Sequence, residues 1–146
     1  MSTVYGEFAF PVKVERDGQF LVLSFRDIPQ ALGQMAASEE SNLDKEALET
    51  LTIALKEYFK LGEPIPKGSA PKKGEKLVTL PLSFVSKIIL HNTMLQNKVR
   101  PATLARRLGI PTSEVARITS PSFKTKIDTM ADAVAASGGK MVLILL

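Results

Sequence analysis

The stretch PATLARRLGIPTSEVARITS, residues 101–120, decides how the second half of this 146-residue chain folds. Two short helices that cross steeply need a small residue at their closest approach, a turn residue that tolerates positive φ, and apolar residues between them. Ala105 is the small residue and Gly109 is the turn residue. The apolar positions are Leu104, Leu108, Ile110, Val115 and Ile118. This spacing predicts a helix-turn-helix over residues 100–119.

The outward-facing side chains of this segment fit a surface that binds DNA. Pro111 suits the first turn of the second helix, where its missing N–H costs little. In DNA-binding helix pairs the N-terminal residues of the second helix face base edges in the major groove. Arg117 is a candidate for bidentate bonding to guanine, and Thr112 and Ser113 are candidates for contacts with phosphate or bases. Phosphate contacts are expected from Arg106, Arg107, Lys124 and Lys126. The candidate DNA-binding residues are Arg106, Thr112, Ser113, Glu114, Arg117, Lys124 and Lys126. The alternative is a structural helical hairpin with a solvated basic face.

The charge of the chain is divided between its halves. Residues 1–66 hold six Lys and Arg against eleven Asp and Glu, a net charge of −5. Residues 67–146 hold thirteen Lys and Arg against four Asp and Glu, a net charge of +9. This division favours two modules with different partners over chance asymmetry within a single domain. The basic half indicates a polyanionic partner.

The first residues predict a small antiparallel sheet. Residues 8–14 alternate between apolar and other side chains, which is typical of a strand. Asp17-Gly18 suits a tight turn that needs positive φ, and the apolar residues 20–25 form the return strand. Pro11 is expected where its missing N–H is harmless, on an edge. A third strand is expected at residues 31–37.

A helix and a connecting segment follow the strands. Apolar residues recur at helical spacing over residues 39–61, with Ser41 or Asn42 as the capping residue, and Gly62 ends the helix. Residues 66–74 are rich in Pro, Gly and Lys, which is typical of a linker or an exposed loop. A short strand at residues 77–80 and a helix from Ser83 to about Asn97 come next. These elements predict an α+β fold.

Composition and motifs exclude several classes of protein. The absence of cysteine fits a reducing compartment. The N-terminus also lacks the pattern of a signal peptide, so we expect a cytoplasmic protein with no membrane partner. His91 is the only histidine, and the acidic residues of 39–49 fit a solvated helix face better than a metal site. We therefore expect no catalytic residue, no metal and no cofactor.

The chain ends in an apolar run, MVLILL, at residues 141–146. A bilayer span takes about 20 residues, so this run is too short to cross a membrane. An exposed strand of this kind invites edge-to-edge pairing, so it either completes a sheet within the chain or pairs with another subunit. We expect a homodimer or higher homo-oligomer, because a dimer suits a helix-turn-helix on a two-fold operator. The candidate dimerisation residues are Met141, Val142, Leu143, Ile144 and Leu145.

These motifs, in this order, resemble those of the HicB antitoxins of bacterial type II toxin–antitoxin systems. The resemblance covers most of the chain. It is carried by Phe-Pro-Val-Lys-Val at 10–14, Asp27-Ile28-Pro29, Pro64-Ile65-Pro66, Leu104-Ala-Arg-Arg-Leu-Gly109, Glu114-Val-Ala-Arg117 and Lys126-Ile-Asp-Thr129. One departure is Gln30, because the family usually has Gly after the Pro of its Asp-Leu-Pro signature.

The resemblance implies a fold and a function for each half. It implies a partial RNase H-like ββ(β)α domain at 1–66 that binds and occludes a small, basic, mRNA-cleaving HicA-like toxin and has no catalytic activity. Asp27, Ile28 and Pro29 are the candidate toxin-binding residues. Residues 67–80 would be a linker with a short strand, and 81–146 a helix-turn-helix domain that dimerises and binds operator DNA.

Two other functions compete with this interpretation. One is a transcription regulator whose N-terminal domain senses a small ligand. The other is a nuclease with an RNase H-like active site.

Overall fold

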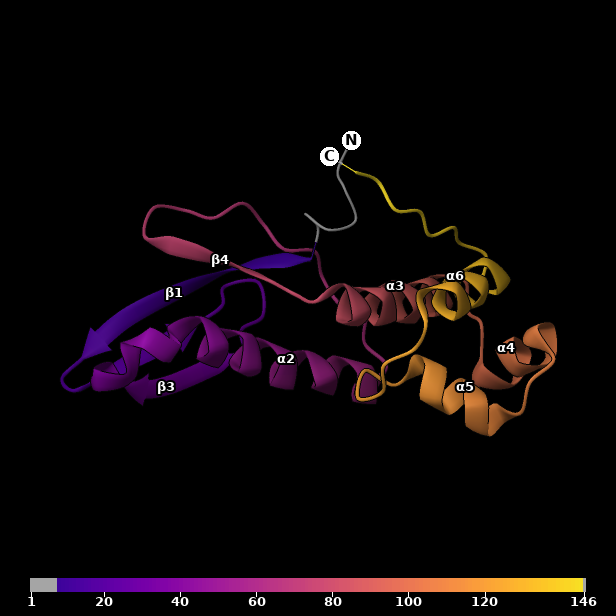
Figure 1. Cartoon of the computed structure of the whole chain (residues 1–146), viewed down its shortest axis with the longest axis horizontal. Helices are drawn as coiled ribbons and strands as arrows, with labels where there is room; N and C mark the ends of the chain where they lie inside the picture. Colours follow the sequence, from indigo (N-terminus) through magenta and orange to yellow (C-terminus); the bar gives the residue numbers. More distant parts are fainter. Residues whose placement is uncertain (1–7, 146) are drawn as a thin grey trace. The chain divides into compact units, whose positions relative to one another are not determined.

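The computed structural model describes residues 8–145, and these residues form two compact units. The first unit contains the chain up to Tyr58 together with Pro66–Leu80. The second contains Phe59–Ile65 and the chain from Pro81 onward. The first unit combines strands with helix and the second is helical (Figure 1), so the predicted α+β class is confirmed. The RNase H-like and helix-turn-helix assignments stay predictions.

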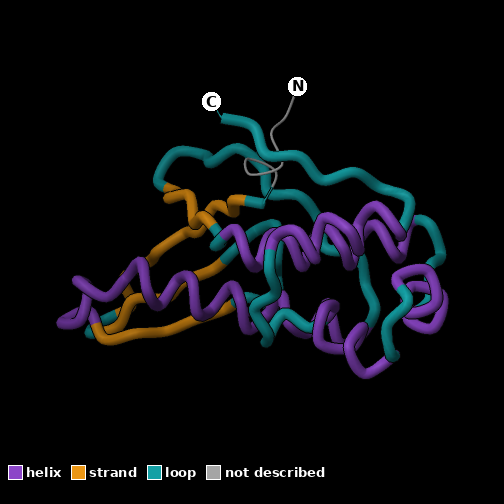
Figure 2. The backbone as a smooth tube through the Cα atoms, turned by 45° about the vertical axis from the view of Figure 1, so that its right-hand side comes forward, coloured by secondary structure: helices purple, strands orange, loops and turns teal. Residues whose placement is uncertain are grey.

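The first unit is built on a four-stranded antiparallel sheet. Its strands are β1 (Ala9–Asp17), β2 (Phe20–Ser24), β3 (Leu32–Ala36) and β4 (Glu75–Thr79), in the spatial order β3-β2-β1-β4 (Figure 2). The predicted hairpin and third strand are therefore present, and β1 extends three residues beyond its expected end at Val14. The sheet also contains β4, which returns to pair with β1 after α2 and the loop that follows it.

Strand β1 explains how a proline is accommodated inside a sheet. Its first half, Ala9–Lys13, pairs with β4, and its second half, Lys13–Asp17, pairs with β2. Pro11 lies in the first half, which β2 does not reach, so β1 is locally an edge there and the missing N–H is harmless. The turn to β2 uses Gly18 at φ 61°, as the sequence predicts.

A short 3-10 segment precedes the helix of the first unit. Residues Ala37–Asn42 form this segment, in which Glu39 has non-helical angles, and helix α2 spans Leu43–Leu61. The helical pattern expected from residue 39 therefore begins in the 3-10 segment, and the expected capping residues Ser41 and Asn42 lie directly before α2. Helix α2 lies along the sheet (Figures 1 and 2). Its buried side chains are Ala47, Leu51, Ala54 and Leu55.

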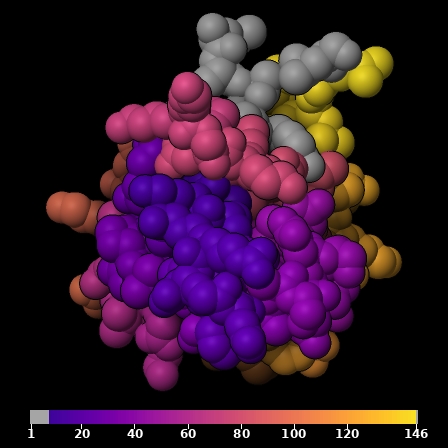
Figure 3. Space-filling view, turned by 90° about the vertical axis from the view of Figure 1, so that its left-hand side faces the viewer, coloured from indigo at the N-terminus to yellow at the C-terminus, as the bar shows by residue number. Residues whose placement is uncertain are grey.

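Residues 67–80 belong to the first unit, because β4 lies within them. The loop before β4 packs closely on β1. A Cβ added to Gly68 would collide with the carbonyl oxygen of Ala9, so this position admits only glycine without a backbone shift. In the space-filling view the loop, in pink, lies against the hairpin, in indigo (Figure 3).

The second unit is helical. Its helices are α3 (Leu82–Gln96), α4 (Pro101–Leu108), α5 (Thr112–Thr119) and α6 (Ile127–Ala136). Its core contains Leu90, Met94, Val99, Leu104, Ala105, Val115, Ile118, Met130, Ala133 and Val134. Helix α3 begins one residue before the expected Ser83, with Pro81 in the capping position. The apolar spacing of this segment also predicts a buried Leu95, but that side chain is exposed.

Candidate nucleic-acid interface

The turn between α4 and α5 has the geometry that the sequence predicts. Gly109 ends α4 with φ 67°, a left-handed conformation that favours glycine. The N–H of Gly109 donates to the Arg106 carbonyl at 3.3 Å, and the N–H of Ile110 donates to the Ala105 carbonyl at 3.0 Å. Pro111 precedes the first residue of α5 instead of lying in its first turn. The turn therefore joins two eight-residue helices through three residues.

Helix α5 has one buried and one exposed side. Val115 and Ile118 are buried in the core of the second unit. The predicted base-facing side chains are all exposed: Thr112, Ser113, Glu114 and Arg117. The Arg117 guanidinium carbon lies 4.9 Å from the centre of the Phe123 ring, a cation–π contact that holds this side chain against the following segment.

The predicted phosphate-binding cations divide into two kinds. Arg106, Lys124 and Lys126 are exposed. Arg107 is exposed too, but its guanidinium donates to the carbonyl of Ala136, at the end of α6, at 2.8 Å. Residues 100–126 contain six Lys and Arg and one acidic residue, Glu114. This surface is thus basic and carries donors that fit phosphate or base edges.

The sequence analysis missed Lys87, a buried cation behind this surface. Its side chain is 2% exposed and belongs to α3. Its Nζ donates to the carbonyls of Arg117 and Ile118 at 3.1 and 2.6 Å, and to the hydroxyl of Thr125 at 2.7 Å. The signal was its spacing, because Lys87 lies three residues from both Phe84 and Leu90 on the buried side of α3.

The candidate toxin-binding residues occupy different environments in the first unit. Asp27 accepts bonds from the backbone N–H of Ser69 at 2.9 Å and from its hydroxyl at 2.8 and 2.9 Å. Ile28 is fully buried, whereas Pro29 is exposed. Gln30, which departs from the family pattern, accepts a hydrogen bond from the Tyr58 hydroxyl at 2.9 Å. Of the three candidates, Pro29 therefore presents the most open side chain.

Asp27 is part of a network that holds the loop before β4. The Nε of Arg26 donates to both carboxylate oxygens of Glu75 at 3.1 Å, and the other guanidinium nitrogens donate to the Ser69 hydroxyl and to the Ala70 carbonyl. This guanidinium is the main reason that the pKa of Glu75 lies below its usual value, and the bond from the Lys72 N–H adds to the effect. The network gives Asp27 a structural role in addition to any contact with a partner.

His91 is a structural residue. Its Nε2 lies 2.6 Å from the carbonyl oxygen of Glu63, and its ring centre lies 4.7 Å from that of Phe59. Beside it, Asn92 both donates to and accepts from the backbone of Ile65 at 2.9 Å. These contacts join 59–65 to α3 and leave the imidazole facing a backbone carbonyl instead of a reactive side chain.

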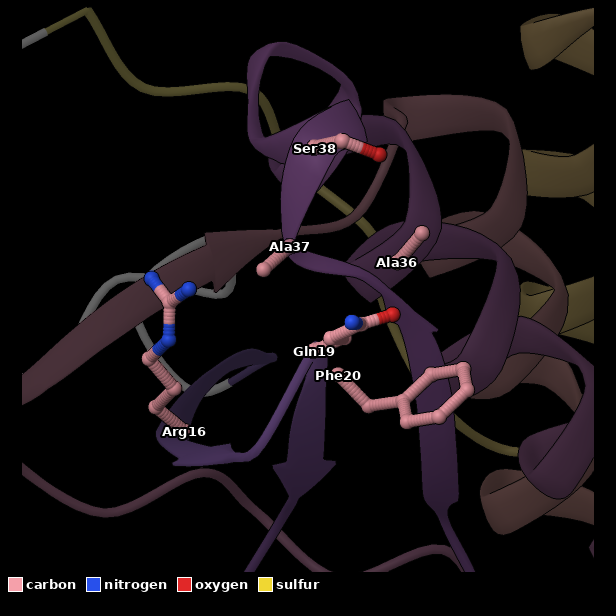
Figure 4. Close-up of a pocket in the computed structure, with 6 residues that line it drawn as sticks. All are labelled: Arg16, Gln19, Phe20, Ala36, Ala37 and Ser38. Atoms are coloured by element: carbon pink, nitrogen blue, oxygen red, sulfur yellow. The ribbon is translucent and has the colours of Figure 1, made fainter.

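A shallow depression lies at the end of the hairpin (Figure 4). Arg16, Gln19 and Phe20 line one side, and residues 36–38 line the other. Arg16 already donates to the Gly18 carbonyl, at 3.1 Å. Within residues 8–145, no group of three or more His, Cys, Asp or Glu side chains is placed to hold a metal ion. No helix in that range has the length and apolar character needed to cross a membrane.

The candidate dimerisation residues, 141–145, have no regular secondary structure in the single chain, and Leu146 lies outside the described residues. The run therefore does not complete a sheet within the described part of the chain. Val142, Leu143, Ile144 and Leu145 are exposed, with Leu145 at 99%. Pairing with another subunit stays a prediction.

Comparison with known proteins gives one consistent result. Residues 9–89 match a family described as HicB-like antitoxin of bacterial toxin–antitoxin systems. Antitoxin HicB 2 of Photorhabdus laumondii is 41% identical over 92% of this chain and 94% of its own length. Antitoxin HicB of Escherichia coli K12 is 36% identical over 88% of this chain and 91% of its own length.

Lys87 predicts a pH dependence of stability. Burial lowers its pKa from the ordinary 10.5 to about 8. As the pH rises from about 8 to about 10, the folded protein releases this proton while the unfolded chain keeps it, so the free energy of unfolding rises. Denaturant unfolding of the parent and of Lys87→Met should show the parent gaining stability relative to the variant across this window.

The comparison isolates Lys87, because the other titrating groups are common to both proteins. The charged side chains on the elements around it are exposed: Glu114, Arg117, Lys124, Lys126 and Asp128. The measured quantity is the free energy of unfolding of the parent minus that of Lys87→Met. If this quantity stays constant or falls from pH 8 to pH 10, it contradicts the lowered pKa of about 8.

Proposed function

Because the chain belongs to the HicB-like antitoxin family, we propose that it neutralises a small mRNA-cleaving toxin of the HicA kind and represses its own operon. The first unit binds the toxin, and the second binds operator DNA through α4 and α5 as a helix-turn-helix. Family membership points to a regulatory role, and in this proposal the chain catalyses no reaction.

The exposed side of α5 is the observation that carries the DNA-binding part. An eight-residue helix exposes Thr112, Ser113 and Arg117, while Val115 and Ile118 fix it to the core. The N-terminal residues of such a helix face base edges in the major groove. In this proposal Arg117, from the last turn of α5, bonds to guanine. The exposed side chains of Arg106, Lys124 and Lys126 bind phosphates in this proposal.

Two substitutions separate base recognition from phosphate binding. Arg117→Ala should lower operator affinity by roughly 1–3 kcal/mol and reduce selectivity, because it removes a base contact. Lys126→Ala should weaken binding to all DNA sequences alike, and it should reduce the slope of log affinity against log salt concentration by about one. Gel shift or anisotropy titrations at several salt concentrations measure both effects.

Lys45→Ala is the matched control, since Lys45 is an exposed lysine on α2, outside this surface. Its operator affinity should equal that of the parent. If Arg117→Ala and Lys126→Ala both bind the operator as the parent does, the proposed docking is wrong.

Toxin binding rests on family membership and on charge. Residues 1–66 carry a net charge of −5, which favours encounter with a basic partner. Within the candidate region Ile28 is buried and Asp27 is bonded to Ser69. Pro29 is therefore the side chain that we propose as a direct toxin contact.

The toxin proposal is tested by co-expression with the neighbouring small basic reading frame. Its product should arrest growth alone and be harmless with this protein. Pro29→Arg should restore growth arrest while the variant stays folded, because it adds bulk and positive charge against a basic partner. Gln96→Arg, an exposed change in the second unit, should still protect. A neighbouring product that is harmless when expressed alone would favour a regulator that senses a small ligand.

Self-association is the third part of the proposal. Residues 141–145 expose four large apolar side chains in a row, and burying them between subunits removes apolar surface from water. Deleting residues 141–146 should lower the molecular mass in solution towards that of a monomer, measured by light scattering. An unchanged mass would reject this role for the C-terminal run.

A further inference from the structure

The ammonium group of Lys87 joins three elements of the second unit. The side chain starts from α3, and its hydrogen bonds reach the last carbonyls of α5 and the hydroxyl of Thr125, in the segment between α5 and α6. Helix α5 is short, and the segment around Thr125 has no regular secondary structure. One side chain therefore fixes the end of α5 and the following segment to the longest helix of this unit.

The three partners match the chemistry of a protonated lysine. An ammonium has three N–H donors and no acceptor, and here two carbonyl oxygens and one hydroxyl oxygen receive them. The carbonyls of Arg117 and Ile118 belong to the last turn of α5, where a positive charge is favourable. These three hydrogen bonds account for the buried charge.

The segments that Lys87 bonds to also carry side chains that we propose bind DNA. Arg117 lies in the last turn of α5, and its carbonyl is one of the bonded oxygens. Lys124 and Lys126 flank Thr125, the third partner. A movement at Lys87 thus displaces the base-reading residue and two phosphate-binding residues together.

We propose that Lys87 is a positioning residue for DNA recognition, whose buried ammonium sets the placement of α5 and of residues 120–126. This inference rests on the proposed binding of DNA through α5. Lys87 cannot itself reach a phosphate, because its side chain is 2% exposed. Its effect on binding is exerted entirely through Arg117, Lys124 and Lys126.

This role makes a prediction that a purely stabilising role does not. Selective binding requires Arg117 to meet a base edge in one geometry, whereas non-selective binding needs only cations near phosphates. Loss of the Lys87 bonds should therefore reduce operator affinity and leave non-operator affinity and the salt slope unchanged. Loss of a purely stabilising residue would lower the melting temperature and leave the selectivity of the folded fraction intact.

The test is Lys87→Met, which keeps an unbranched apolar stem and removes the three donors. At a temperature where the variant is folded, operator affinity should fall roughly tenfold, within the range of one lost base contact, with no change in the salt slope. Lys45→Met, on the exposed side of α2, is the matched control and should match the parent. Operator and non-operator affinities that fall equally, or do not fall, would overturn the inference.

A second variant and a second measurement cover the remaining cases. Thr125→Val removes only the hydroxyl acceptor, so it should shift selectivity in the same direction by a smaller factor, and it carries the test if Lys87→Met does not fold. Amide hydrogen exchange of residues 118–126 should speed up in both variants without any DNA. Unchanged exchange would overturn the role of Lys87 even if the parent binds operator, whereas faster exchange with no operator binding by the parent would reject the proposed function alone.

Discussion

Helices α4 and α5 have eight residues each, and isolated helices shorter than about 12–15 residues are marginal in water. The surface that they form therefore depends on tertiary packing. Leu104 of α4, Val115 and Ile118 of α5 and Met130 of α6 are almost fully buried in one cluster. This shared apolar cluster holds the two helices at a fixed crossing, although neither would be stable alone. It therefore also fixes the position of the side chains on the exposed side of α5.

Packing alone leaves the ends of such short helices unsatisfied, because the first four N–H groups and the last four C=O groups of a helix have no partner within it, which is half of each kind in eight residues. In the second unit, side chains from other helices bond these ends. Lys87 of α3 serves the end of α5, while Arg107 of α4 and Asn97 after α3 serve the end of α6. The apolar core and these polar contacts together connect all of its helices, so side chains outside the DNA-facing surface contribute to its shape.

The sequence predicted those parts of the structure that follow from local pattern. Gly109 was identifiable because a tight turn between helices needs a left-handed residue, and Pro11 because a missing N–H needs a free edge. Long-range contacts were not predictable in this way. The sequence could not show that Lys87 turns inward to carbonyls thirty residues away, or that the signature residue Ile28 is buried while Gln30 bonds to Tyr58. Lys87 and Gln30 are of residue types that usually face solvent, and here each bonds to a partner far along the chain.

The contacts of the basic side chains change how the net charge of the second half is interpreted. Its net charge of +9 counts every cation equally, but Lys87 is buried and Arg107 is bonded to a helix end. A positive charge that neutralises a helix terminus interacts with backbone dipoles, and moving it to a phosphate would cost those bonds. The cations free to displace counterions from DNA are thus fewer than the sequence suggests, with Arg106, Lys124 and Lys126 among them. Basic residues in such a small domain divide between holding the surface in shape and contacting the polyanion, and only the three-dimensional contacts distinguish the two roles.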